Sequence, residues 1–403
     1  MAEKTVQGGG QGGLSRMQQQ QALQQANMNA RRAVLRSAFP MLQSIFSNTF
    51  QPATQNTFQL PPQNVGLMRG LLIRMTATVT NPASGSSTLS LTPLGPSNLV
   101  QNFVFTDLQN YQRINTTGWH IAMLNSLRSG RPWLSSTPSD SPMGFGSNWP
   151  IIKAPSTIAT GASGTVNMYY YIPFAYAEND LTGAIYMNVV NATANLQVTL
   201  ATAAQAIVAN TADPTLAIYQ GAGAVAGVTL TNVQVQIYQD YLDQLPMTQK
   251  GPVLPSVDLN TMYELKNTSF SAIVQGQDFY MAYSNFRHFL STMALYNNQS
   301  NGAYPSPGSD INYWSQRAAN ATDLRKCDPY TWETFARRKI QTDFPIPLYV
   351  FDTRAKPVFT TQSGNMNLVM NPSLVNTGAS VLVAWEMLAN ISNLLNAGSL
   401  ASS

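Results

Sequence analysis

The stretch LLIRMTATVT, residues 71–80, decides the fold class because its side chains alternate in character. Every odd-numbered residue in it is apolar, and every even-numbered residue after Leu72 is Arg or Thr, until the run stops at Asn81-Pro82. A period of two is typical of a strand that buries one face in a core and turns the other to solvent. The stretch therefore predicts a half-buried β-strand.

The same alternation recurs along the chain. It is clear at residues 166–173 and 233–238, and shorter runs at residues 279–283, 348–351, 368–370 and 381–385 also read as strands, with Pro and Gly turns between them. Many short strands joined by polar loops favour antiparallel sandwiches or barrels over alternating strands and helices. The predicted fold class is all-β.

An N-terminal helix is predicted ahead of the first strand. From Ser15 the chain is rich in Gln, Ala, Leu, Met and Arg, which are good helix formers, and Pro40 ends the pattern. At helical spacing one narrow face collects Leu23, Ala26, Ala30, Ala33 and Val34. The helix is amphipathic, but a stripe that is mostly Ala is too thin to bind a membrane or a partner strongly by itself.

Two short loop helices and a linker complete the predicted organisation. Asp213-Pro214 and Asp328-Pro329 each offer an N-cap followed by Pro at the first helical position. The Pro and Gly of residues 244–256 suit a linker. We therefore predict a basic, Gly/Gln-rich arm and helix at residues 1–45, a first eight-stranded body at 46–245, a linker at 246–256, a second body at 257–390 and a tail at 391–403.

The scarcity of charge points to assembly. Only 10% of the 403 residues are charged, whereas about 25% is usual in soluble domains. A surface covered by Asn, Gln, Ser and Thr forms hydrogen bonds well but repels neighbours poorly. We expect much of this surface to be covered in a permanent assembly; the alternative is a secreted, polar β protein.

The net charge of +4 comes from the N-terminal arm. Residues 1–36 hold five basic residues and one acid, which leaves 22 − 5 = 17 basic and 18 − 1 = 17 acidic residues in the body. A neutral body argues against a nucleic-acid-binding face on the folded domains. The candidate binding residues are therefore those of the arm, Arg16, Arg31, Arg32 and Arg36, of which Arg32 and Arg36 point away from the apolar stripe.

The chain shows no signs of export. It has a single cysteine, Cys327, so no intrachain disulfide can form. Residues 1–30 lack the apolar run of a signal peptide, and no stretch approaches the roughly 18 apolar residues that span a bilayer. We expect the protein to be made and to fold in the cytoplasm.

Catalytic and cofactor chemistry is not indicated. The two histidines, His120 and His288, are far apart in sequence, and no zinc-ligand spacing or nucleophile elbow occurs. The Gly-rich residues 221–227 precede a strand instead of a helix, which favours a tight turn over a nucleotide site. Asp323, Asp328 and Glu333 lie among basic residues and suggest a structural or intersubunit ion-pair network. We predict no enzyme, no cofactor, no metal and no small-molecule substrate.

Several longer segments resemble a known family. They include Asp180-Leu181-Thr182-Gly183-Ala184. The others are Leu134-Ser135-Ser136 with Asp140-Ser141-Pro142, Ala217 to Gly223, Tyr241 to Pro246, Asp310 to Tyr313 with Ser315-Gln316-Arg317, Asp323 to Trp332, Thr342 to Pro345, and Asn371-Pro372. These segments occur in order from about residue 30 to 398 and are similar to the major capsid proteins of tectiviruses, icosahedral bacteriophages with an internal membrane.

The resemblance implies a structural protein of the virion. It implies two eight-stranded jelly rolls in one chain, a homotrimer with pseudo-hexagonal shape, and a shell around an internal viral membrane that the N-terminal helix approaches. Its partners would be other copies of itself, that membrane, and minor capsid and vertex proteins. Two alternatives remain open: a membrane-free coat whose arm contacts nucleic acid, and a carbohydrate-active β-sandwich protein.

Overall fold

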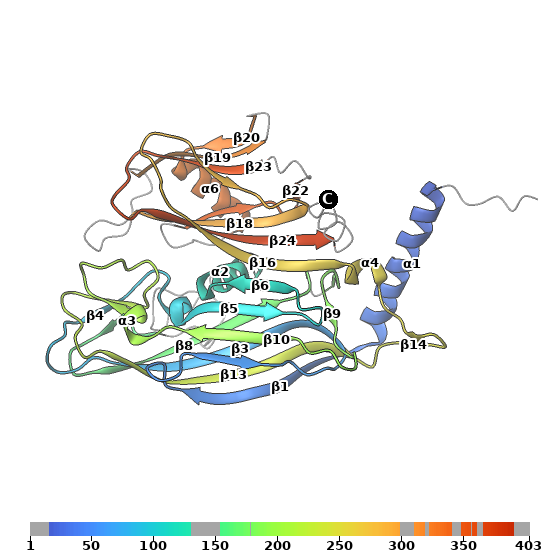
Figure 1. The fold of residues 1–403 in the computed structure, drawn as a ribbon, viewed down its shortest axis with the longest axis horizontal. Helices are drawn as coiled ribbons and strands as arrows, with labels where there is room; N and C mark the ends of the chain where they lie inside the picture. The colour runs from blue at the N-terminus through green and yellow to red at the C-terminus, as the bar shows by residue number, and fades with distance from the viewer. Residues whose placement is uncertain are drawn as a thin grey trace, which may run out of the picture.

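The computed structural model describes residues 16–129, 154–177, 179–298, 310–318, 322–340, 348–355, 357–360 and 366–390. It consists of two stacked β bodies, with the N-terminal helix α1 (Arg16–Ser37) projecting beside them (Figure 1). The predicted all-β class is confirmed. The Gly-rich start of the arm and the tail at 391–403 lie outside the described residues.

The first body is an eight-stranded jelly roll. One sheet has the order β1 (Phe39–Phe50), β13 (Thr229–Asp243), β3 (Leu67–Thr80) and β8 (Ser163–Pro173). The other has the order β2 (Thr57–Leu60), β10 (Asn195–Leu200), β5 (Val100–Thr106) and β6 (Gln112–Thr116). β1 begins at Phe39, within the residues that the sequence assigns to the arm.

Smaller elements decorate this body. A third, smaller sheet of four strands contains β4 (Leu89–Leu91), β7 (Thr157–Ile158), β11 (Ile207–Val208) and β12 (Tyr219–Gly221), and β9 (Ile185–Tyr186) pairs with β3. The short helices are η1 (Gly95–Leu99), α2 (Gly118–Ser129) and α3 (Ala203–Ala206).

The second body repeats the same topology. Its sheets have the orders β16 (Thr261–Phe270), β24 (Ser380–Asn390), β18 (Arg287–Asn297), β21 (Leu348–Asp352), and β17 (Phe279–Ala282), β23 (Met366–Pro372), β19 (Ile311–Ala318), β20 (Asp323–Cys327). β22 (Val358–Phe359) pairs with β18, and α6 (Pro329–Ile340) follows β20. Each of these eight strands has a counterpart in the first body, which holds the same place in chain order and has corresponding neighbours in its sheet.

The two bodies share a sheet. The connection between them contains the hairpin β14 (Met247–Thr248) and β15 (Gly251–Pro252), and the short helix α4 (Ser256–Leu259). β6 then pairs in parallel with β16, with Ile114 opposite Leu265, which joins half of each jelly roll into one nine-stranded sheet. The main core cluster also runs across this joint, because Leu265, Met293 and Val350 of the second body pack with it.

The alternation that predicts strand 71–80 is confirmed. Leu71, Ile73, Met75, Ala77 and Val79 are fully buried, and the strand extends four residues further toward the N-terminus than the pattern indicates. The other predicted strands are also present, most of them longer. Pairing with neighbours extends a strand beyond its alternating core, which is why its ends are hard to predict.

The helices agree less well with the pattern. α6 begins at Pro329, and Asp328 caps it by accepting a hydrogen bond from the Thr331 amide at 2.9 Å. The helix expected at Asp213-Pro214 is absent. There the Asp213 carboxylate accepts the Thr215 amide at 2.8 Å and a hydrogen bond from Asn297, so it stabilises a turn that does not continue into a helix.

Helix α2 is not predicted by the sequence pattern. Its first ten residues are all buried, so it lacks the polar face that marks an amphipathic helix. At its start, a Cβ on Gly118 would meet the backbone oxygens of Ser97 and Val100, the latter at 2.7 Å. Glycine lets the helix enter between the sheets at this point.

Among the described residues, no helix combines the length and the apolar character that crossing a membrane requires.

Candidate assembly surfaces

The first strand, β1, is an exposed sheet edge without charge. Nine of its twelve residues are exposed, and its sequence FPMLQSIFSNTF has no ionisable side chain. Phe39 and Leu42 keep 60% and 58% of their surface exposed. Edge strands of soluble proteins usually carry charges that discourage pairing with other chains. β1 has a bulge at Ile45, and Pro40 lies near its start, but the strand carries no such charge.

The outer edge of β1 also has unused hydrogen-bonding groups. β1 pairs with β13 on one side, and within the described part of the chain no strand pairs with its other side. Alternate backbone N–H and C=O groups on that side are available to another strand. An uncharged edge of this kind is suited to a permanent contact.

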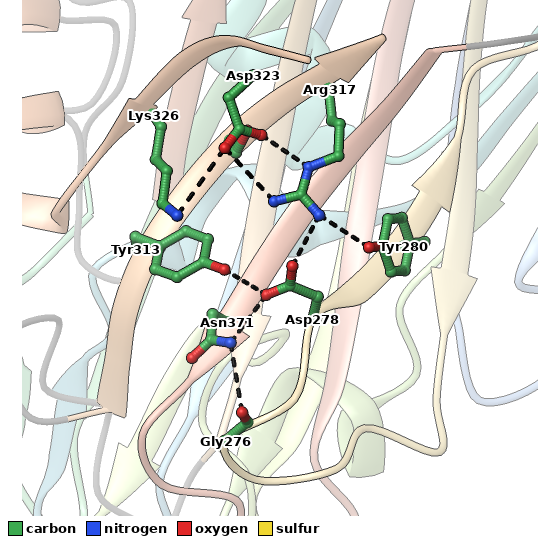
Figure 2. A network of polar contacts seen from close by, with 9 residues as sticks. Gly276, Asp278, Tyr280, Tyr313, Arg317, Asp323, Lys326 and Asn371 are labelled. Carbon is green, nitrogen blue, oxygen red and sulfur yellow. Dashed lines mark hydrogen bonds and ion pairs between the residues drawn. The ribbon is translucent and has the colours of Figure 1, made fainter. Parts of the chain in front are cut away.

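A polar network lies on the last sheet of the second body (Figure 2). Arg317 on β19 reaches between two carboxylates: its Nη1 donates to Asp278 Oδ2 at 2.7 Å and its Nε donates to Asp323 Oδ1 at 2.7 Å. The same Nη1 lies 2.8 Å from the hydroxyl of Tyr280, and Lys326 Nζ lies 3.8 Å from Asp323 Oδ2. One guanidinium thus connects the turn before β17 to the edge strand β20.

Both carboxylates of this network are held ionised. Burial opposes the charge on Asp278, but hydrogen bonds from Tyr313, Asn371 and Arg317 outweigh it and lower the pKa of Asp278. The pKa of Asp323 is lowered by Arg317 first and then by Ser315. The network is therefore an ion-pair cluster with fixed charges, as the sequence suggests for Asp323, although its central cation is Arg317.

The network holds the edge strand β20 in place. Lys326 Nζ lies 3.9 Å from the centre of the Tyr313 ring, and β20 pairs with β19 from Asp323 to Cys327. Leu324 on this strand is 55% exposed. β20 therefore presents a second well-ordered edge, which carries basic side chains where β1 has none.

A buried ion pair joins the two bodies. Arg128, at the end of α2, donates to Glu386 Oε1 on β24 at 2.9 Å, and Glu386 has no exposed surface. Tyr263 donates to the same oxygen at 2.8 Å, and Ser291 donates to Oε2 at 2.6 Å. Burial opposes ionisation of Glu386, yet Arg128 and these hydrogen bonds lower its pKa overall.

A second polar cluster lies at the same joint. Arg287 Nε donates to the buried Glu264 Oε2 at 2.6 Å, and the Tyr111 hydroxyl of the first body donates to Glu264 Oε1. Burial, followed by the charge of Glu264, raises the pKa of Tyr111 to about 12, so its hydroxyl stays protonated. Two of the ion pairs of this protein thus lie where its two bodies meet.

The N-terminal helix is fastened by Arg31. Its Nε donates to Asp258 Oδ2 of α4 at 2.8 Å, and its Nη2 bonds to the other oxygen of the same carboxylate. Asp258 is 2% exposed, and Asn27 and Thr182 each donate to its Oδ1 at 3.3 Å. This bidentate contact holds the C-terminal part of α1 against α4.

The four arginines predicted for the arm separate into two groups. Arg31 is engaged by the body, whereas Arg32 and Arg36 are exposed, and Arg16 is the first residue of α1. The apolar stripe is shorter than predicted: Val34 is buried, but Leu23 is 55% exposed. The end of α1 nearer the N-terminus projects away from the stacked bodies (Figure 1), and none of the described residues buries Leu23.

Asp258→Asn tests this fastening. The substitution keeps the shape but removes the charge that Arg31 contacts, and we expect a loss of about 1 to 3 kcal/mol in helix docking. In hydrogen exchange, the amides of residues 27–36 should exchange about fivefold to 150-fold faster, while those of β13 stay unchanged. The control Arg32→Gln changes an exposed neighbouring residue and should leave the exchange rates of both segments unchanged. Equal exchange rates for Asp258→Asn and the parent would contradict the role of Asp258.

The histidines do not form a metal site. His120 is fully buried on α2, and its Nδ1 lies 2.6 Å from the Thr116 hydroxyl, so it is a packed core residue. His288 lies on β18, in the other body. In the described ranges, no three His, Cys, Asp or Glu side chains are grouped so as to hold a metal ion.

Sequence comparison identifies relatives over most of the chain. The model for the P3 major capsid protein N-terminal family matches residues 11–245, and the model for the C-terminal family matches residues 260–402. The major capsid protein P3 of Enterobacteria phage PRD1 is 42% identical over 386 residues, which cover 96% of both chains.

Solved structures share the fold at much lower identity. The major capsid protein of Sulfolobus Turreted Icosahedral Virus aligns with a TM-score of 0.61 at 11% identity, over 87% of this chain and 97% of that chain. PBCV-1 VP54 aligns with a TM-score of 0.54 at 10% identity, over 87% and 93% of the two chains. The shared fold is the double jelly roll.

Proposed function

The chain belongs to the P3 major capsid protein family and is a structural protein of the virion shell, and from this premise we propose that it assembles as pseudo-hexameric homotrimers into an icosahedral shell around an internal membrane. The relationship to the PRD1 protein, 42% identity over nearly the whole chain, carries this proposal. Membership of a family of capsid proteins does not support the alternative of a carbohydrate-active protein.

The composition and the exposed edge support the oligomer. Obligate interfaces are depleted of charge at their centres, and a chain with 10% charged residues and an uncharged exposed strand suits such contacts. The proposed division into an arm at 1–45, jelly rolls at 46–245 and 257–390, a linker at 246–256 and a tail at 391–403 gives each trimer six jelly rolls.

Light scattering on the purified chain tests the trimer. We expect a stable particle with three times the 43.9 kDa mass of one chain, unchanged over a hundredfold dilution. A particle with the mass of a single chain at all concentrations would contradict the proposal, because such a monomer would expose the surface that we propose is covered.

The arm is proposed to face the membrane. Arg16, Arg32 and Arg36 are the arginines left after Arg31 pairs with Asp258. Each basic residue near an anionic surface contributes roughly 1 kcal/mol, so three give about 3 kcal/mol, which is a weak contact for one subunit. Many subunits on a closed lattice act together and can hold a vesicle inside the shell.

Charge reversal tests the membrane contact. As free trimers, the Arg32→Glu/Arg36→Glu protein should bind vesicles of anionic phospholipid several tenfold more weakly than the parent at low salt, with little difference at high salt. Arg74→Glu, at an exposed position on β3, serves as the control with a single reversed charge outside the arm. Equal vesicle binding by the parent and the arm variant would contradict a lipid role for these residues.

The alternative partner of the arm is the phosphate of nucleic acid, and the composition of purified particles separates the two cases. Purified particles that contain phospholipid in amounts matching a closed inner layer support the membrane; particles with genome but no lipid would favour a membrane-free coat.

We further propose that the chain is made in the host bacterial cytoplasm, supported by its single cysteine, and that minor capsid and vertex proteins complete the shell.

A further inference from the structure

The two strands that form the joint between the bodies, β6 and β16, each have a counterpart in the other body. The strand orders β1-β13-β3-β8 and β16-β24-β18-β21 correspond, as do β2-β10-β5-β6 and β17-β23-β19-β20. In this correspondence β20 is the counterpart of β6, and both are followed by a helix, while β1 is the counterpart of β16. β6 and β16 pair with each other inside the chain, but β20 and β1 have unpaired outer edges in the described ranges.

The correspondence holds residue by residue on the β20 side. In the first body, Phe105 lies opposite Ile114, and a bulge separates this pair from the next. In the second body, Gln316 lies opposite Arg325, and the bulge falls at the same point of the ladder. Arg325 and Lys326 therefore occupy the places of Ile114 and Asn115, the two residues through which β6 contacts β16.

The β1 side can be aligned in the same way. A bulge in β3 follows the pair Gly70 and Asp240, and a bulge in β18 follows the pair Ser291 and Glu386. Asp240 thus occupies the place of Glu386. Across the sheet, Asp240 lies opposite Leu42, and Glu386 lies opposite Leu265.

We propose that β20 of one copy pairs in parallel with β1 of the next copy, with Arg325 opposite Leu42 and Lys326 opposite Gln43. This repeats between chains the contact of Ile114 with Leu265 and of Asn115 with Lys266 that joins the bodies within one chain. The partner is a second copy, and the proposal rests on the homotrimer proposed above.

The positions of the edges allow such a joint. β1 and β20 lie at opposite ends of the stacked bodies, at the bottom and the top of Figure 1. A contact between two different surfaces of identical chains is head-to-tail, and it closes into a ring when its rotation divides a full turn. A ring of three copies would then contain one kind of joint six times, three within chains and three between them.

The two edges differ in charge. β20 carries Arg325 and Lys326 beside Asp323. β1 carries no charge, and β13, next to it, carries Asp243 and also Asp240, which Arg69 pairs at 2.6 Å within the chain. The joint within the chain also has a basic residue on one side and an acidic residue on the other. Arg128, on the helix that follows β6, pairs with Glu386 on β24, the neighbour of β16. Arg128 is the eleventh residue of α2, and the eleventh residue of α6 is Lys339, also a base.

A cysteine pair tests the register. In a Cys327→Ser background, Gln43→Cys/Lys326→Cys would place two thiols on neighbouring strands, about 4.8 Å apart between Cα atoms, within the range of a disulfide. Mild oxidation of the assembled protein should give covalent dimers and trimers on a non-reducing gel, and no larger species. The matched control, Thr49→Cys/Lys326→Cys, moves one thiol six residues along the same edge, roughly 20 Å away, and should give none.

The outcomes separate this joint from the trimer itself. If light scattering shows trimers of the Gln43→Cys/Lys326→Cys protein but no cross-link forms, the β1 to β20 joint is wrong and the trimer stands. If the control pair cross-links as well as the matched pair, the register is wrong. A parent chain without trimers would overturn both.

A second variant does not depend on disulfide chemistry. Leu42→Lys should raise the concentration at which trimers dissociate by at least about tenfold, because it places a second positive charge opposite Arg325 in the proposed contact. Val190→Lys changes a residue that is 83% exposed in the loop between β9 and β10, off both edges, and should leave dissociation unchanged. Dissociation of Leu42→Lys at the same concentration as the parent would overturn the proposal.

Discussion

Arg128→Met should destabilise the protein by about 3 kcal/mol or more, the largest effect expected from a single substitution here. Glu386 has no exposed surface, and Arg128 is its charged partner across the joint. Methionine keeps the apolar stem but leaves the buried carboxylate without its direct ion-pair partner, and breaking such a pair typically costs about 3 to 5 kcal/mol. Urea unfolding of the purified assembled protein measures the loss.

Two controls isolate the charge. Arg74→Met changes an arginine that is exposed on β3 and should alter stability by less than about 0.5 kcal/mol. Arg128→Met/Glu386→Gln removes both charges and should recover a large part of the loss. If Arg128→Met and Arg74→Met have the same small effect, the ion pair does not hold the bodies together.

The second large effect is a loss of stability in mild acid. Burial lowers the pKa of His120 to about 4, from a usual value near 6.5, against a smaller opposing effect of Glu386. Between these two pH values the unfolded chain binds a proton that the folded chain does not. Stability should therefore fall as pH drops from 6.5 to 4, by up to about 3 kcal/mol in total.

His120→Asn tests the source of this slope. Asparagine retains a polar atom near Thr116 but does not titrate, so the variant should lose most of the pH dependence between 6.5 and 4. A smaller slope should remain from His288, whose pKa is also lowered by burial. Glu386 acts in a different window: its pKa is lowered, so its contribution is lost only below about 4.5. An unchanged slope in His120→Asn would contradict this assignment.

The strands and the family could be predicted from the sequence because their signals are local. The alternation around Ile73 and Met75 is complete within ten residues, and segments such as Asp180 to Ala184 are recognisable by themselves. Helix α2 could not be predicted in this way, since burial of all its sides removes the amphipathic pattern. Asp213 was a misleading cap because its carboxylate stabilises a turn.

The polar contacts at the joints could not be predicted, because their partners are remote in sequence. Arg128 and Glu386 are separated by 258 positions, and Arg31 and Asp258 by 227. The sequence shows that the arm is basic, but only the fold shows that Arg31 is used to fasten it. The composition is informative in another way: it indicates a surface that is covered in an assembly, and in the described part of the chain β1 is an edge with no strand on its outer side.

Hydrogen exchange across β1 in the assembled protein tests most directly whether identical copies cover this surface. The outward amides of an uncovered edge strand exchange about as fast as those of a loop, whereas amides paired with another strand are protected. We predict that the outward amides between Met41 and Ser44, the part of β1 that lies opposite β20 in the proposed joint, exchange as slowly as those of the central strand β13. Exchange as fast as that of the exposed loop around Val190, in protein that light scattering shows to be assembled, would contradict the claim.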